Sequence, residues 1–436
     1  MTLNIKKISA ETAWIFLGQL MVVAGSIFGI RVLTYLLSPS TYGNLAIGMT
    51  AVVLVQEIIL NPLGHSFLRY FSSAYEDKQL SVYFKTVRFL LTRATVLVVV
   101  VAVISVIGLF LTGNTKWIGL FSLAFLYALF SGYNVVLNYI QNAARQRKVV
   151  ALHQGIGQWL RFLIPVGLIG LWGADSFVVM FGYVIAALII LISQVMFLKK
   201  NFITLITTTI EKVPIDVLNK YGRKIFAYAW PFATWGLFTW AQFVSSRWAL
   251  LSFATIRDVG FYSVLYQFGC YPIIVVSGAV SQVLTPVLFS RAGSGDDLTR
   301  VTNTIRLNYG LILAAGIVTV MFVAGSYMFH KKIFSLIVAP EYCLVSSLLP
   351  LFVLSGGLLA GGFMLNVMFM IKANTKVLIY PKIVTAILGV VLNYLGAYFY
   401  GLIGVVVAGV AFPLVYFVWI VMLHILDKNG MGLEGK

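Results

Sequence analysis

The sequence predicts an all-α, polytopic membrane protein with about twelve transmembrane helices in two pseudo-symmetric six-helix lobes. Three observations favour this fold class. Of the 436 residues, 60% are hydrophobic and only 10% are charged, whereas roughly 25% are charged in an average soluble domain. The mean hydropathy is +0.96. The apolar character extends along the whole chain, which excludes a soluble enzyme and a soluble domain on a single membrane anchor.

Apolar segments follow one another from the N-terminus to the C-terminus. Each is long enough to supply the roughly 20 apolar residues that cross a bilayer, and far longer than the strands of a membrane barrel. By residue number, the predicted spans are 12–37, 42–70, 88–112, 117–140, 150–172, 176–198, 225–250, 259–289, 305–328, 345–371, 377–399 and 401–426.

Lysine and arginine alternate between the two sides of these segments. With the N-terminus placed in the cytoplasm, 21 of them fall in the inside stretches and 4 in the outside stretches. This asymmetry predicts that both termini are cytoplasmic. It also accounts for the net charge of +18, so no nucleic-acid partner is expected. An arrangement of fourteen helices, with two further spans, would keep the same alternation and stays open.

The longest polar stretch, residues 199–224, lies between the sixth and seventh spans. We expect it to be a cytoplasmic linker between an N-terminal lobe, 1–198, and a C-terminal lobe, 225–436. In both lobes an arginine near the outer end of the first span is followed 12 or 13 residues later by a glycine, as Arg31 and Gly43 and as Arg247 and Gly260. This match favours a parallel repeat, as in transporters whose substrate site lies between two lobes.

Five ionisable residues lie inside predicted spans, where a charge is costly unless it faces a partner or a polar lumen. Arg161 and Glu57 are near the middle of their predicted spans. Arg31, Arg247 and Lys382 each lie one to two helical turns from one end of a predicted span. Because cations outnumber carboxylates, the lumen should attract an anion such as a phosphate or an acidic sugar. Arginine suits this role because its planar fork meets phosphate oxygens in pairs. A structural ion pair is the alternative for Glu57 and Arg161.

These residues define the predicted site. Arg31, Arg161, Arg247 and Lys382 are the expected substrate contacts, and Glu57 is the candidate for coupling transport to an ion gradient. The sequence holds no P-loop, no cluster with metal-ligand spacing and no catalytic constellation in a loop. We therefore expect neither a cofactor nor a metal, and a protein that is not an enzyme.

Three patches of sequence resemble a known family. They are residues 28–43, residues 258–263, and residues 371–376 followed by 392–395 and 401–408. Together they resemble the Wzx-type polysaccharide flippases, which belong to the multidrug/oligosaccharidyl-lipid/polysaccharide (MOP) exporter superfamily. The resemblance covers the whole chain in topology and only these patches in motif.

The resemblance implies a flippase that moves undecaprenyl-diphosphate-linked oligosaccharide repeat units across the bacterial inner membrane, for O-antigen, capsule or exopolysaccharide. It implies H+ or Na+ as the coupling ion, contact with membrane lipids, and a polysaccharide polymerase and a chain-length regulator as partners. Many relatives carry an acidic residue beside the basic one near the end of the seventh span. Here residues 245–248 read Ser-Ser-Arg-Trp, so this site lacks that carboxylate.

Three other functions stay open. A drug antiporter of the MATE type belongs to the same superfamily, but would favour carboxylates in its lumen. A lipid II flippase of the MurJ type usually has two more helices than the sequence predicts here. A membrane-embedded glycan polymerase or ligase would usually need a large outer loop, and the longest predicted outer loop, about 329–344, is short.

Overall fold

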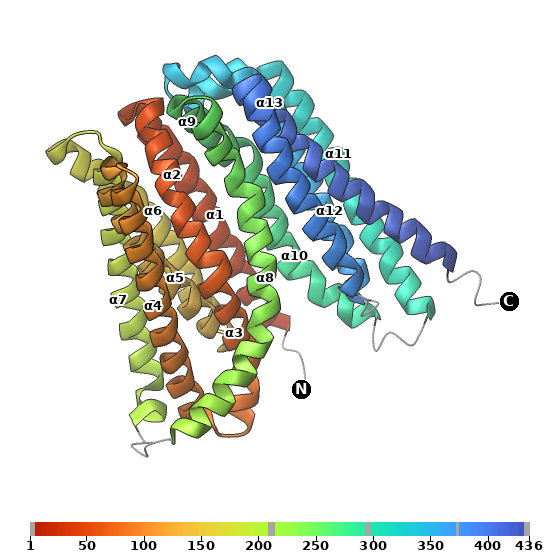
Figure 1. The fold of residues 1–436 in the computed structure, drawn as a ribbon. Coiled ribbons are helices and arrows are strands. Elements are labelled where there is room, and N and C mark those ends of the chain that lie inside the picture. The colour runs from red at the N-terminus through yellow and green to blue at the C-terminus, as the bar shows by residue number, and fades with distance from the viewer. Residues whose placement is uncertain (1–4, 208–213, 293–297, 372–374, 431–436) are drawn as a thin grey trace. The chain divides into compact units, whose positions relative to one another are not determined.

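The computed structural model describes residues 5–207, 214–292, 298–371 and 375–430, and these residues form helices without a strand (Figure 1). The elements of the first part are α1 (Ile5–Leu36), α2 (Pro39–Val55), η1 (Gln56–Leu60), α3 (Asn61–Glu76), α4 (Leu80–Leu111), η2 (Thr115–Trp117), α5 (Ile118–Ala143), α6 (Arg147–Trp172) and α7 (Ser176–Thr207). Those of the second part are α8 (Ile215–Phe253), α9 (Ile256–Leu265), η3 (Tyr266–Cys270), α10 (Tyr271–Ala292), α11 (Leu298–Ile337), η4 (Pro340–Leu348), α12 (Leu349–Ile371), η5 (Thr375–Leu378) and α13 (Ile379–Gly430).

Within these ranges, ten helices or helix runs are long and apolar enough to cross a membrane. The prediction of an all-helical, multi-pass membrane protein is therefore confirmed. The last of the ten, Ile379–Leu426, contains two of the predicted spans. Helix α8, which contains the predicted span 225–250, is not among the ten.

Gly401 divides the long helix α13 into two. Its φ of 54° and ψ of −131° are not helical, and a side chain would be strained at this positive φ. The break lies at the boundary between the predicted spans 377–399 and 401–426. Near the turn, a Cβ on Gly396 or Gly404 would overlap the backbone of the other residue. Glycine at both positions thus lets the two halves of α13 meet backbone to backbone.

By its contacts the chain forms two compact units. The first is Met1–Gly29 with Asn44–Trp240, and the second is Ile30–Gly43 with Ala241–Lys436. The boundary between the units crosses α1, α2 and α8 rather than the polar stretch 199–224. Part of that stretch, 208–213, lies outside the described residues. The division into lobes 1–198 and 225–436 stays a prediction.

The same order of elements occurs once in each half of the chain. A helix with glycine as its fifth residue, α2 or α9, is followed by a π-turn, η1 or η3. The next helix, α3 or α10, has proline as its second residue, Pro62 or Pro272. Proline lacks an N–H and its ring clashes with the carbonyl four residues earlier. The wider π-turn before each proline accommodates this local distortion.

Residues 30–43, from the end of α1 to the start of α2, pack within the second unit. A Cβ on Gly43 would overlap the carbonyl oxygen of Ile256, and a Cβ on Gly260 would overlap that of Pro39. Two side chains add hydrogen bonds nearby. The Tyr42 hydroxyl donates to Gln267 Oε1 at 3.1 Å, and the Tyr342 hydroxyl donates to the carbonyl oxygen of Leu37 at 3.0 Å. The paired glycines therefore allow the first turns of α2 and α9 to touch.

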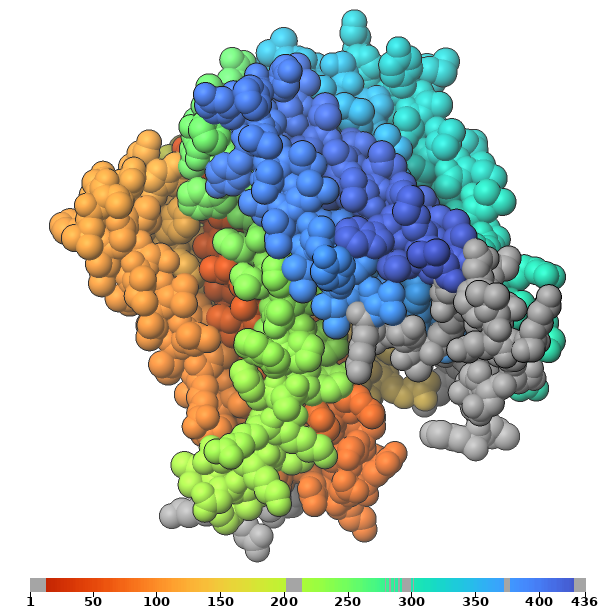
Figure 2. Space-filling view, turned by 45° about the vertical axis from the view of Figure 1, so that its right-hand side comes forward, coloured from red at the N-terminus to blue at the C-terminus, as the bar shows by residue number. Residues whose placement is uncertain are grey.

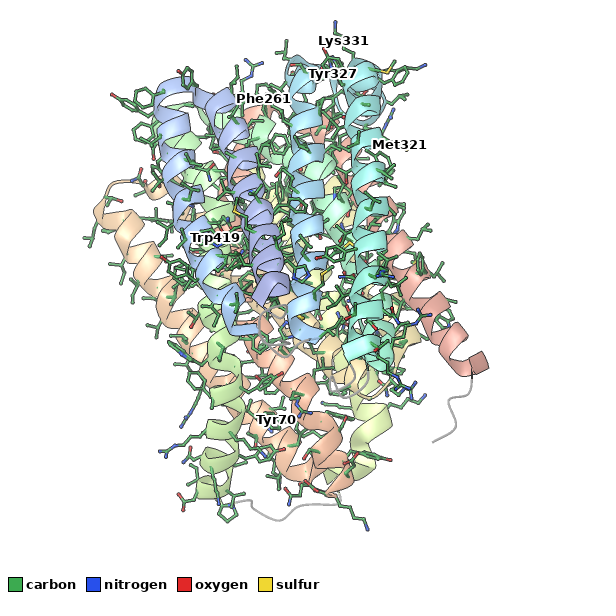
Figure 3. All side chains as sticks on the ribbon, turned by 90° about the vertical axis from the view of Figure 1, so that its right-hand side faces the viewer. Tyr70, Phe261, Met321, Tyr327, Lys331 and Trp419 are labelled. Atoms are coloured by element: carbon green, nitrogen blue, oxygen red, sulfur yellow. The ribbon has the colours of Figure 1, made fainter. Side chains whose placement is uncertain are left out.

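Two helices expose most of their apolar side chains. Only 11% of the most apolar stretch of α4 and 6% of that of α11 is buried. Figure 2 shows the surface of α4 in orange, and Figure 3 shows Met321 and Tyr327 on the outside of α11. Water would not solvate such surfaces favourably. These faces are suited to the hydrocarbon of a bilayer.

Candidate functional site

Arg161 lies in the middle of α6 among aromatic rings of three helices. Its guanidinium carbon is 4.6 Å from the centroid of the Tyr183 ring, 5.7 Å from that of Tyr127 and 5.8 Å from that of Phe162. Such cation–π contacts contribute up to about 2 kcal/mol each when they are desolvated. Since the rings come from α5, α6 and α7, packing of these helices holds the charge at mid-height of the first unit.

A cavity of about 180 Å³ opens beside Arg161. The described residues around it carry one permanent positive charge, that of Arg161, and no carboxylate. Their polar side chains are mostly amides and hydroxyls. They are Tyr127, Ser131, Asn134 and Asn138 of α5, His153, Gln154, Gln158 and Arg161 of α6, and Tyr183 and Gln194 of α7.

The cavity is elongated along the helices. On α6 its lining residues extend from His153 to Arg161, a rise of about 12 Å at 1.5 Å per residue. On α5 and α7 the lining extends over a similar length, from Tyr127 to Asn138 and from Tyr183 to Gln194. The cavity is therefore a groove between the three helices. Arg161 and the two tyrosines lie at one end of it, and His153 and Gln194 at the other.

Two amides in this groove use their N–H groups but not their carbonyl oxygens. Gln194 Nε2 donates to Asn138 Oδ1 at 3.1 Å, and Asn134 Nδ2 donates to the carbonyl oxygen of Ala187 at 2.9 Å. Gln194 Oε1 and Asn134 Oδ1 are buried and accept no hydrogen bond from the described residues. A buried acceptor without a donor costs about 1–3 kcal/mol. The groove therefore favours an occupant that carries O–H or N–H groups, water included.

Lys382 lies in a second polar cluster, in the second unit. Its side chain is 5% exposed, and Nζ donates to Gln242 Oε1 at 3.1 Å. Gln242 Nε2 in turn donates to the carbonyl oxygen of Thr385 at 3.2 Å, and Asn393 Nδ2 donates to Ser245 Oγ at 2.8 Å. These contacts connect α8 with α13. Lys382 is thus built into a packed network rather than exposed on an open surface.

Arg247, which is itself on α8, makes its contacts next to this cluster. Its Nη1 donates to the carbonyl oxygen of Phe243 at 3.2 Å, and its Nε donates to Ser263 Oγ at 3.3 Å. The guanidinium carbon is 5.6 Å from the ring centroid of Tyr266. The structure therefore brings Arg247 and Lys382 to adjacent residues of one helix turn, Gln242 and Phe243.

Arg31 and Glu57 occupy different surroundings. Arg31 is exposed, and its guanidinium carbon is 5.8 Å from the ring centroid of Tyr35. Glu57 is half-buried in the π-turn η1, where its Oε1 accepts a hydrogen bond from Asn61 Nδ2 at 3.0 Å. Gly236 of α8 packs directly on the Glu57 backbone. Of the five predicted residues, Glu57 and Arg161 belong to the first unit and the other three to the second.

The amides around Arg161 are further candidate site residues, which the pattern of charges in the sequence does not indicate. Asn134 and Asn138 are four residues apart on α5, and Gln154 and Gln158 are four apart on α6. Residues four apart lie on one face of a helix. A search of the sequence for amide pairs at this spacing would have identified them. Such pairs would be sought on the helix that carries a deep arginine and on its neighbours.

The family model described as "Polysaccharide biosynthesis protein" matches residues 8–292 of this chain. No individually curated protein sequence matches the chain.

Solved structures share the fold at low sequence identity. A lipid II flippase MurJ in an inward closed conformation aligns with a TM-score of 0.71 and 14% identity, over 95% of this chain and 87% of that one. An inward-facing multidrug resistance MATE family transporter of the MOP superfamily aligns with a TM-score of 0.66 and 16% identity, over 94% and 95%. The Vibrio cholerae MATE transporter VcmN in its bent form aligns with a TM-score of 0.57 and 15% identity, over 95% and 97%.

The family match confirms the resemblance to polysaccharide biosynthesis proteins. The solved structures show that this chain shares its fold with a lipid II flippase and with MATE transporters.

Proposed function

Since the chain belongs to the polysaccharide biosynthesis protein family, we propose that it flips undecaprenyl-diphosphate-linked oligosaccharide repeat units across the bacterial inner membrane. The product would supply a surface polysaccharide such as O-antigen, capsule or exopolysaccharide. The observation that carries this proposal is the positive charge inside a flippase-type fold, half-buried at Arg161 and buried at Lys382. A diphosphate headgroup does not cross hydrocarbon alone because burying its charge is prohibitive. Fixed cations in a water-accessible path would lower that cost.

We propose Arg31, Arg161, Arg247 and Lys382 as contacts for anionic groups during transport. Arg31 is the exposed member of the set and is the most accessible to a large substrate. Arg247 and Lys382 are held by α8 and α13, so they would act after these helices change their packing. The groove at Arg161 has a volume of about 180 Å³. It can therefore admit one anionic group of the substrate and not a whole oligosaccharide.

We propose twelve spans in two pseudo-symmetric lobes, with both termini in the cytoplasm. The ten candidate helices, the division of α13 at Gly401 and the addition of α8 make up this number. The same order of elements, a helix, a π-turn and a helix that begins with proline at its second residue, occurs in α2–α3 and in α9–α10. This order supports the repeat.

Lipid mass spectrometry on cells that lack the gene tests this function. We expect an undecaprenyl-diphosphate oligosaccharide to accumulate on the cytoplasmic side and the surface polysaccharide to disappear, and the spectrum would identify the sugars. Accumulation of lipid II would instead support a function like that of MurJ. Periplasmic repeat units that fail to polymerise would support a polymerase. No change in lipid or glycan, together with sensitivity to cationic drugs, would support an antiporter of the MATE type.

Glu57→Gln should impair transport if Glu57 carries the coupled proton. Glutamine keeps an oxygen that can accept from Asn61 Nδ2, as Glu57 Oε1 does at 3.0 Å, so folding should be largely unaffected. We expect proton uptake into proteoliposomes during substrate transport to fall about tenfold or more, because the site can no longer exchange a proton. Glu76→Gln, at the exposed end of α3, is the matched control. Equal proton uptake by the Glu57 variant and the control would remove Glu57 from the mechanism.

A further inference from the structure

We propose that His65 relays the coupled proton between Glu57 and the end of α3, which the proposed topology places at the cytoplasmic surface. The relay rests on the proposed role of Glu57 in coupling and gives Glu57 a route for its proton. Carboxylates and histidines that follow one another inside membrane spans are typical of proton relays.

Polar side chains recur once per turn along one face of η1 and α3. Glu57, Asn61 and His65 are each four residues apart, and all three are half-buried. Residues at this spacing share a face of a helix, and Glu57 Oε1 accepts a hydrogen bond from Asn61 Nδ2 at 3.0 Å. Eight residues separate the carboxylate from the imidazole, a rise of about 12 Å. This polar stripe therefore holds two groups that can exchange a proton, with one amide between them.

His65 is held by rings of two other helices, both within the first unit. Its Nε2 lies 3.0 Å from the Tyr139 hydroxyl of α5, and its ring stacks on that of Phe232 of α8, with 5.1 Å between the centroids and 15° between the planes. Gly64 allows the first contact, because a Cβ there would overlap the Tyr139 ring. Aromatic faces attract cations, so this setting can hold the imidazole in its charged form as well as in its neutral form.

The hydrogen bond to Tyr139 suits both protonation states of His65. A neutral imidazole has one N–H and one acceptor nitrogen, so Nε2 can accept from the Tyr139 hydroxyl while Nδ1 keeps its proton. A second proton makes both nitrogens donors, and the hydroxyl oxygen then accepts from Nε2. Only the O–H of Tyr139 has to rotate, so His65 keeps this partner in both states.

The relay consists of two proton transfers. A proton from water at the end of α3 binds a ring nitrogen of His65, and an imidazolium forms. One N–H bond of the imidazolium then breaks, an O–H bond forms on the Glu57 carboxylate, and His65 is neutral again. Water carries the second transfer, because a rise of about 12 Å is longer than a direct hydrogen bond. Asn61 Oδ1 can accept from such a water while Nδ2 donates to Glu57.

The charges near His65 favour movement of its proton toward Glu57. On η1, α3, α5 and α8, titratable or charged side chains occur within eight residues of His65 or of the rings that it contacts. They are Glu57, Arg69 and Tyr70 on η1 and α3, Tyr133 and Tyr139 on α5, and Lys224 and Tyr228 on α8. The two cations lie toward the end of α3, where Arg69 is exposed and Lys224 Nζ is 5.2 Å from the ring centroid of Tyr70. Cations repel an imidazolium and a carboxylate attracts it, so the proton is not trapped on His65.

Magnetic resonance of the purified full chain with nitrogen-15-labelled histidine tests the protonation of His65 without a substrate. The chain has four histidines, so the signals that disappear in the His65→Ala variant identify this ring. We expect them to titrate between about pH 5 and 8. A ring that stays in one protonation state over this range would overturn the relay.

Proton uptake during transport tests the relay itself. Proteoliposomes are supplied with lipid-linked oligosaccharide extracted from cells that lack the gene. We expect His65→Ala to slow proton uptake about tenfold, and added imidazole to restore most of the rate, because it can enter the space that the side chain leaves. An unchanged rate in this variant would refute the relay. A loss that imidazole does not restore would assign His65 to packing instead.

His330→Ala is the matched control. His330 on α11 is also half-buried, and its Nδ1 lies 3.0 Å from Ser346 Oγ, so it is a histidine–hydroxyl pair outside the polar stripe. It should keep the rate of the unaltered protein. If His65→Ala does not fold, Tyr139→Phe keeps the ring against α3 but loses the hydroxyl. It should slow proton uptake about threefold, and an unchanged rate would count against the relay.

Glu57→Gln distinguishes failure of the relay from failure of the proposed coupling. If proton uptake falls in Glu57→Gln and not in His65→Ala, the relay is wrong and the coupling role of Glu57 remains. If uptake is unchanged in Glu57→Gln, the coupling role is wrong and the relay is wrong with it.

Discussion

Arg161→Ala should abolish transport while the protein still inserts into the membrane. Among the described residues that line the groove, the guanidinium carries the one permanent charge, and three rings hold it in place. An anion that approaches the groove of the alanine variant would meet amides and hydroxyls and no compensating charge. Losing a charge-assisted contact of this kind costs about 2–4 kcal/mol. We therefore expect surface polysaccharide to fall at least about thirtyfold at native expression, as measured by glycan staining and immunoblotting of the protein.

The conservative variant Arg161→Lys distinguishes the effect of the positive charge from the effect of the planar guanidinium shape. Lysine keeps the charge but loses the planar fork that lies among Tyr127, Phe162 and Tyr183. Partial transport by the lysine variant would show that charge is the main requirement. Arg93, which is exposed on α4 beside an aromatic ring, is the matched arginine outside the groove, and Arg93→Gln should leave the glycan unchanged. Normal surface glycan in the alanine variant at native expression would show that transport does not depend on Arg161.

The transmembrane segments are the part of the fold that the sequence predicts well. Apolar runs of more than 20 residues leave the chain little choice, because backbone groups in a bilayer must be satisfied within a helix. The helix break at Gly401 can also be predicted from the sequence, since a glycine between two apolar runs is a common helix break. The π-turns η1 and η3 were not predicted. Pro62 and Pro272 indicate a distortion there, but not which wider turn will absorb it.

The sequence predicts only part of the surroundings of the candidate site residues. A deep arginine in an apolar helix indicates a polar surrounding, and the structure places Arg161 in a polar groove. The sequence predicts that Lys382 lines a lumen, and the structure adds a hydrogen bond to Gln242, a residue 140 positions away. Sequence alone does not reveal such a long-range partner, because any of several helices could face Lys382. The amides of α5 and α7 likewise can be recognised as lining residues of one groove only after the helices are packed together.

Gly260→Ala should destabilise the second unit, and Gly43→Ala should do the same. A Cβ at either position would overlap a backbone carbonyl oxygen, that of Pro39 or of Ile256. Backbone atoms cannot rotate away as side chains can, so the first turns of α2 and α9 must separate. Overpacking of this kind costs about 1–3 kcal/mol. We expect each variant to melt several degrees lower in detergent than the unaltered protein.

The double variant is the sharper test of this contact. Once the first alanine has separated the two turns, the second alanine should add little. The fall in Tm of the double variant should therefore be much smaller than the sum of the falls in the two single variants. Gly316→Ala on α11 is the control, because a Cβ there would meet open space, and alanine is the better helix former by about 1 kcal/mol. Strictly additive losses would mean that Gly43 and Gly260 act at independent places. The matched glycines at the start of α2 and α9 would then reflect local helix geometry rather than one shared contact.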